Sequence, residues 1–150
     1  MTALRIPVDE VAEQGLAGVA VSSAHGYSLA VDHGICAAHF YVPTCRRAFE
    51  AAGAFGHLSG VDDESLQHRL REVAVLAELP LSEVRLLRDC RPVMRDKSGS
   101  LAKRVLRAAE ARSVMSLCDS LYSRLGSGER VDMVLTGLAP DVRQFLGVSA

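Results

Sequence analysis

The sequence predicts an all-α protein, with a globular bundle of short helices over residues 7–91 and a helical hairpin over residues 100–138. No segment alternates strictly between apolar and polar residues, as a half-buried strand would. Alanine, leucine and valine dominate the apolar positions, aromatic residues are few and tryptophan is absent. A length of 150 residues suits one domain, so we expect a single domain over residues 1–150.

The first helix is expected over residues 7–21, with Asp9 as its N-cap and one apolar face. Gly15 and Gly18 are unfavourable inside a helix, by up to about 1 kcal/mol each relative to alanine. We therefore expect another helix to approach these two glycines closely. A second, short helix is expected over residues 27–33, ending before a glycine.

Prolines set the bounds of the next helices. Pro43 opens a third helix that continues to about Ala54, with Phe40 and Phe49 pointing inward. A fourth helix begins at Asp62 or Asp63, ends before Pro80 and carries an apolar repeat at Leu66, Leu70, Val73 and Leu76. A fifth helix is expected over residues 83–90, capped by Ser82, with an inward face of Val84, Leu86 and Leu87.

The longest run free of proline and glycine lies between Ser100 and Gly126, which suit an N-cap and a C-terminal stop. Residues 96–99 are expected to form a hinge before it. The helix would be roughly 37 Å long at about 1.5 Å per residue. Its apolar residues occupy more than one narrow stripe, so it needs partners on two sides. After a glycine-rich turn, a shorter helix follows over residues 131–138, and a last turn begins at Pro140.

The second half of the long helix is the expected self-association surface. One interpretation places its apolar residues against a second copy of the chain, and the other leaves them to close the core of a single chain. The residues in question are Val114, Leu117, Leu121 and Leu125, with Val131, Val134 and Leu138 on the following helix. The chain is expected to form a homodimer or a larger homo-oligomer.

The charge is unevenly distributed. Residues 1–84 carry a net charge of −6, residues 85–112 a net charge of +6, and residues 113–150 a net charge of −1. The basic segment can contact an acidic protein surface, which we favour, or nucleic acid, which is secondary. Its candidate contact residues are Arg85, Arg88, Arg91, Arg95, Lys103, Arg104 and Arg107.

The sequence contains no phosphate-binding loop, dinucleotide fingerprint, HExxH, GxSxG or EF-hand pattern. We therefore expect no enzyme activity, no catalytic residues and no cofactor. Cys36, Cys45, Cys90 and Cys118 form no CxxC pair and are expected to be small core residues. A metal site with His33 or His39 is the less favoured alternative, because the spacing of these residues does not match common ligand patterns.

Two stretches resemble a known family when they are taken together. The first runs from Ile6 to Gln14, with a proline and an Ala-Glu-Gln triplet, and is followed by Leu16 and Gly18. The second is His39-Phe40-Tyr41, followed by Pro43, Arg46 and Phe49. Their order and spacing resemble the N-terminal domain of DnaB-type replicative helicases, and a looser similarity extends to about residue 138.

The resemblance implies a helical head, a hairpin that dimerises with its neighbour, and a role in receiving primase. The ATPase domain of such helicases has no counterpart in the sequence. We therefore expect a replication-associated adaptor that binds a replicative helicase, a primase or both. Two alternatives remain: the N-terminal fragment of a longer helicase, and a DNA-binding regulator that uses residues 85–112.

No stretch approaches the roughly 20 apolar residues that a membrane-spanning helix needs. The N-terminus carries Asp9, Glu10 and Glu13 where a signal peptide has an apolar core. The sequence thus predicts a soluble, cytoplasmic protein without membrane contact.

Overall fold

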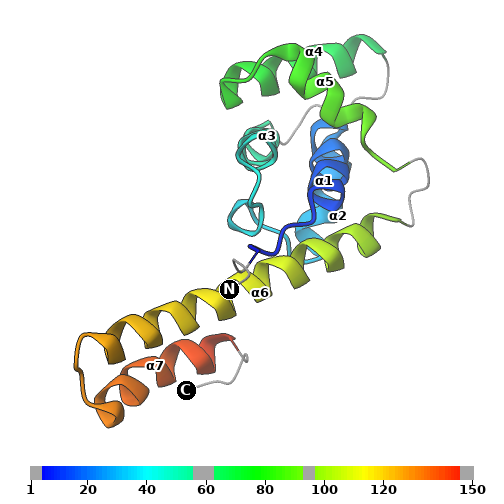
Figure 1. Ribbon diagram of the computed structural model, residues 1–150. Coiled ribbons are helices and arrows are strands. Elements are labelled where there is room, and N and C mark those ends of the chain that lie inside the picture. Colours follow the sequence, from blue (N-terminus) through cyan, green and yellow to red (C-terminus); the bar gives the residue numbers. More distant parts are fainter. Residues whose placement is uncertain (1–4, 56–62, 93–96, 146–150) are drawn as a thin grey trace. The chain divides into compact units, whose positions relative to one another are not determined.

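A computed structural model describes residues 5–55, 63–92 and 97–145 (Figure 1). Every regular element among these residues is helical, so the predicted all-α class is confirmed. The elements are α1 (Glu10–Ser22), α2 (Ala24–Asp32), the 3₁₀ turn η1 (Ala37–His39), α3 (Pro43–Ala54), α4 (Asp63–Ala77), α5 (Leu81–Asp89), α6 (Lys97–Gly126) and α7 (Val131–Phe145).

The chain divides into two compact units. The head unit comprises Val8–Ala109, and the hairpin unit comprises Glu110–Ala150 together with Met1–Pro7. The division falls within α6, so the first half of this helix belongs to the head unit. The sequence instead predicted a head that ended at residue 91.

Helix α1 is the central element of the head unit, and α2, α3, α4 and α5 all contact it (Figure 1). A Cβ atom on Gly18 would lie 2.1 Å from the carbonyl oxygen of Leu87 in α5. A Cβ atom on Gly15 would lie 2.9 Å from Leu101 Cδ1 in α6. The expected close approach at both glycines is therefore confirmed, because α5 and α6 use the space that a side chain would fill.

The core of the head unit combines small residues on α1 and α3 with a few large side chains. Phe49 lies at its centre, with ring centroids 4.9 Å from both Tyr27 and Phe40. Phe40 and Phe49 are buried, as predicted. Leu16, Leu70, Val73 and Val105 are also fully buried in this cluster.

A buried arginine connects the ends of two helices in the head unit. Arg69 on α4 donates hydrogen bonds to the backbone oxygens of Val21 and Ala20, at the end of α1. It also donates to those of Ala52 and Phe55, at the end of α3. Carbonyl groups in the last turn of a helix lack the usual partner four residues on, so a side-chain donor is favourable there. The Ala52 oxygen also accepts from Phe55 N–H at 3.3 Å. Burial lowers the pKa of the Arg69 guanidinium.

Helix α5 differs from its prediction in register. It begins at Leu81 and has Pro80 at its N-cap, so Ser82 is not the cap. Val84 and Leu87 are buried, but Leu86 is 64% exposed. Residues three apart share a helix face, whereas residues two apart point about 200° away from each other. The predicted inward position of Leu86 was therefore wrong.

Helix α6 begins earlier than predicted. Lys97, Ser98 and Gly99 form its first turn rather than a hinge, and Ser100 lies within the helix. Ser98 is buried. A Cβ atom on Gly99 would lie 3.2 Å from the ring of His33, so this glycine leaves room for a neighbouring side chain.

Helix α7 is longer than predicted. It continues through Pro140 to Phe145, so the separate turn predicted from Pro140 is wrong. Proline costs one backbone hydrogen bond in a helix, because it has no N–H to donate to the residue four positions earlier. The remainder of that predicted turn, Leu146, lies outside the described residues.

Candidate interaction surfaces

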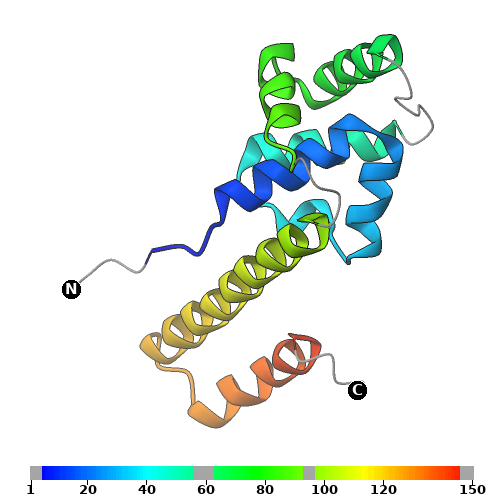
Figure 2. The ribbon, with the colours of Figure 1, turned by 90° about the vertical axis from the view of Figure 1, so that its right-hand side faces the viewer.

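The hairpin unit contains an apolar groove between α7 and the second half of α6. Helix α7 returns antiparallel to this half of α6 (Figure 2). The groove has a volume of about 510 Å³. Each helix lines it with residues spaced i, i+3, i+4, i+7, which share one helix face. They are Val114, Leu117, Cys118 and Leu121 on α6, and Leu135, Leu138, Ala139 and Val142 on α7, with Arg143 at its edge.

Most of the apolar residues in this unit remain accessible to solvent. Only Val134 and Leu138 are buried among its described residues. No residue of α6 after Ala109 is buried. Tyr122 and Met133 are 84% and 60% exposed. The hairpin therefore leaves apolar surface that its own two helices do not cover.

The residues predicted for self-association fall into two groups. Val134 and Leu138 are buried within the hairpin unit. The other five remain partly or largely accessible: Leu117 and Leu121 are half-buried, and Val114, Leu125 and Val131 are exposed. Of these five, Val114, Leu117 and Leu121 line the groove.

Arg124 fixes the geometry of the hairpin turn. Its guanidinium donates two hydrogen bonds to Glu129 Oε2, at 3.0 and 2.8 Å. The Nη1 atom of the same guanidinium would lie 2.8 Å from a Cβ atom placed on Gly137. Arg124 thus reaches from the end of α6 to α7 beside a glycine.

The basic residues predicted to contact a partner have different environments. Arg104 forms a two-pronged ion pair with Asp9, at 2.7 and 2.9 Å. Its hydrogen bonds hold the pKa of Asp9 below the ordinary value. Arg85 donates to Gln67 Oε1 at 3.2 Å. These contacts lie within the head unit, so Arg104 and Arg85 have structural partners.

The remaining basic residues are less constrained. Arg88 is half-buried, and its Nε atom is buried without a hydrogen-bond partner in the described part of the chain. Arg91, Lys103 and Arg107 are exposed. Arg95 lies outside the described residues. Among the described residues, Arg85 and Arg88 lie on α5, Arg91 directly follows it, and Lys103, Arg104 and Arg107 lie on α6.

Glu13 joins the two stretches on which the family resemblance rests. This residue is fully buried on α1. Its two carboxylate oxygens accept hydrogen bonds from the backbone N–H groups of Tyr41 and Val42, both at 2.9 Å. Val42 is the N-cap of α3 and has no capping side chain, so the Glu13 carboxylate, which comes from another helix, places its negative charge at the start of α3, where the helix dipole favours it. Sequence patterns did not reveal this role.

Three of the four cysteines are not core residues, which corrects the prediction. Cys45 is buried, and its burial raises its pKa to about 12. Cys36, Cys90 and Cys118 are exposed, because they lie at a turn, at a helix end and on the groove side of α6. Cys36 N–H donates to His39 Nδ1 at 3.0 Å, and its Sγ lies 4.0 Å from His39 Nε2. Within the described ranges, no three metal-ligating residues form a group.

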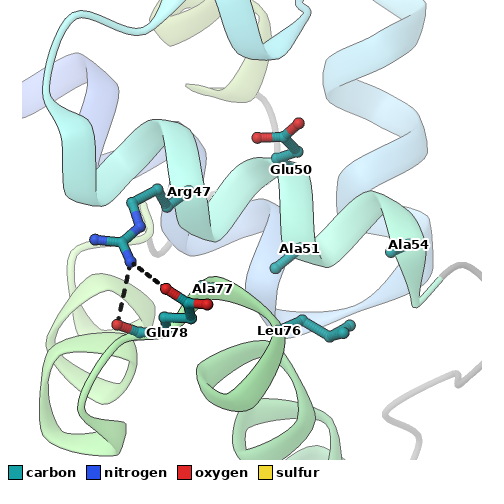
Figure 3. A pocket seen from close by; sticks show the side chains of 7 residues that line it. All are labelled: Arg47, Glu50, Ala51, Ala54, Leu76, Ala77 and Glu78. Atoms are coloured by element: carbon teal, nitrogen blue, oxygen red, sulfur yellow. Dashed lines mark hydrogen bonds and ion pairs between the residues drawn. The ribbon is translucent and has the colours of Figure 1, made fainter.

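A shallow pocket of about 340 Å³ lies between α3 and the end of α4 (Figure 3). Arg47 Nη2 reaches the backbone oxygen of Glu78 at 3.3 Å and its Oε2 at 3.5 Å. Glu78 has a φ of 54°, and Leu79 N–H donates to Ala74 O in the pattern of a Schellman helix end. The pocket is therefore explained by the way α4 ends, and we assign no ligand to it.

Comparison of the chain with protein-family models, with curated proteins and with solved structures found no match. The similarity to the DnaB-type N-terminal domain thus rests on the residues alone and stays a prediction. None of the described helices is both long and apolar enough to cross a membrane.

Proposed function

We propose that this chain is a non-enzymatic adaptor that self-associates through its hairpin unit and binds a replicative helicase, a primase or both. The apolar groove between α6 and α7 is the observation that carries this proposal. A two-helix hairpin with so little buried apolar surface gains stability when a further layer covers it. In a protein-interaction role, a partner would cover the exposed apolar side chains of this surface.

The shape of the groove favours a second copy of the same hairpin as its occupant. Each helix contributes a stripe of the same spacing, and two such hairpins related by a twofold axis would form a four-helix bundle. The charge of the hairpin is compatible with this arrangement. Residues 110–145 carry four basic and five acidic residues, a net charge of −1, so two copies do not strongly repel each other.

The replication role is supported by the resemblance and by one structural contact. The Ala-Glu-Gln and Phe-Tyr stretches gave the resemblance its specificity. Glu13 belongs to the first, and its carboxylate binds the backbone of Tyr41 and Val42 in and after the second. This contact gives a physical reason for the two stretches to occur together, 28 and 29 residues apart.

Pull-down of a helicase and a primase from the same replication system tests the adaptor role. The immobilised chain should retain at least one of them at micromolar concentration. The Leu117→Asp variant, which places a charge in the groove, shows whether retention depends on the hairpin. If neither protein binds the unaltered chain, the adaptor function is refuted.

A further inference from the structure

Residues 97–109, the part of α6 in the head unit, have an exposed face made only of basic residues and serine. The next exposed residue of the helix is Glu110. The buried residues of this part are Ser98, Leu101, Ala102 and Val105, spaced i, i+3, i+4, i+7. Its exposed residues, hereafter the basic stripe, are Lys97, Ser100, Lys103, Arg104 and Arg107. The stripe spans about 15 Å along the helix axis at about 1.5 Å per residue. No Asp or Glu occurs between residues 97 and 109.

This charge distribution is unfavourable for the helix itself. The N-terminal end of a helix carries a partial positive charge, which favours Asp and Glu there and disfavours Lys and Arg. Lys97 lies in the first turn of α6, where this effect acts, and no acidic residue occurs in that turn. Asp9 compensates Arg104 through their ion pair. Among the described residues, no ion pair of this kind is formed by Lys97, Lys103 or Arg107. Contacts within the folded chain therefore do not account for the positive charge at these three positions.

The composition of the stripe distinguishes between two kinds of anionic partner. Protein interfaces have a core of apolar and aromatic residues and contain little lysine. Lysine, arginine and serine are the side chains that contact the phosphates of nucleic acids. The stripe carries no aromatic residue on which an unpaired base could stack, which favours a duplex over a single strand.

We propose that the basic stripe of α6 binds the phosphate backbone of duplex DNA without sequence specificity. Lys103 and Arg107 are four residues apart, which places them about 6 Å apart along one helix face. Together with Lys97 they neutralise roughly three phosphates. A plot of the logarithm of the binding constant against the logarithm of the salt concentration should then have a slope of about −2.7. This contact belongs to the head unit, so it does not depend on self-association through the hairpin.

Fluorescence anisotropy of the full chain with a labelled duplex of arbitrary sequence tests the proposal. Raising the salt concentration from about 50 mM to about 200 mM should weaken binding roughly 40-fold. The double variant Lys103→Glu with Arg107→Glu should lose at least about tenfold in affinity and lower the salt slope by about two. Glutamate is well tolerated in the first half of a helix, so the circular dichroism of this variant should remain helical.

The matched control is the double variant Arg71→Glu with Arg130→Glu. It makes the same change in net charge at two exposed positions outside the stripe, and it should retain the affinity of the unaltered chain. Three results would overturn the proposal: no duplex binding at the lower salt concentration, an equal loss in the control, or binding of labelled poly-glutamate in place of the duplex. The last result would identify an acidic protein as the partner.

Discussion

Glu13 is the residue that most directly connects α1 to the start of α3. A carboxylate offers an acceptor to each of the two N–H groups that it faces, whereas a glutamine side chain offers one acceptor and one donor. The Glu13→Gln variant should therefore lose one hydrogen bond and place two donors against each other, at a cost of about 2 kcal/mol. Urea denaturation measures this difference.

Glu10 provides the control for that experiment. It lies on the same helix but is exposed, so Glu10→Gln should change stability by no more than about 0.5 kcal/mol. Equal stabilities for the two variants would contradict the proposed contribution of the Glu13 hydrogen bonds at the start of α3.

Asp9 makes the stability of the head unit depend on pH. It caps α1 through Ala12 N–H at 3.0 Å and pairs with Arg104. Because its pKa is lowered on folding, the pair stabilises the protein fully above about pH 4, the ordinary pKa of an unfolded aspartate. That contribution is lost as the pH falls through the lowered value. Asp9→Asn keeps a good capping residue but removes the charge.

We expect Asp9→Asn to be less stable than the unaltered chain at pH 6, and less stable by a smaller margin near pH 3 (about one unit below the ordinary aspartate value). Urea denaturation at the two pH values measures both differences. A difference that stays the same across this range would show that the ion pair contributes nothing to stability.

At the scale of elements, the packing of α5 on α1 depends on Gly18, which has no side chain. The position of a Cβ atom on Gly18 coincides with the backbone of α5, which cannot move without displacing the whole helix. Gly18→Ala should therefore destabilise the head unit by about 2 kcal/mol or more, in spite of the better helix propensity of alanine. Thermal unfolding measures the loss.

Gly126→Ala is the matched substitution, because Gly126 also lies in a helix but a Cβ atom there would meet nothing within 4 Å. It should leave stability unchanged or raise it by up to about 1 kcal/mol. If both alanine variants behaved alike, the close contact between α1 and α5 would not be the reason for Gly18.

The elements were largely predictable because their bounds are set by local chemistry. Pro43 begins α3 and Asp9 caps α1, as the sequence predicted. The face of α5 was misassigned because a short helix offers few apolar residues to fix its register. The roles of Glu13 and Arg69 were not predictable, because their partners are backbone groups up to 49 residues away, and a side-chain pattern carries no information about those groups.

The candidate surfaces were predictable only in part for a related reason. The apolar spacing identified Val114, Leu117 and Leu121 as one surface, and all three line the groove. The same spacing does not tell which residues the second helix of the hairpin covers, so Val134 was grouped with residues that remain accessible. The basic residues were chosen by the sign of their charge alone. The sign does not tell that Arg104 forms an ion pair with Asp9, whereas its exposed neighbour Lys103 forms none among the described residues.

At the scale of the whole molecule, the two units present different chemistry along one helix. The first half of α6 exposes charge, and its second half exposes apolar side chains. We infer that the hairpin unit serves the association of copies, while the head unit remains available to other partners. Self-association is the central claim, because the adaptor proposal depends on it.

Light scattering of the purified chain, over a range of micromolar concentrations, tests this claim most directly. The unaltered chain should have at least twice the monomer mass of 16.1 kDa, and Leu117→Asp should have the monomer mass while keeping its helical circular dichroism. Ser116→Asp adds the same charge at a neighbouring exposed position outside the groove lining and should keep the larger mass. A mass of 16.1 kDa for the unaltered chain at every concentration would contradict the account.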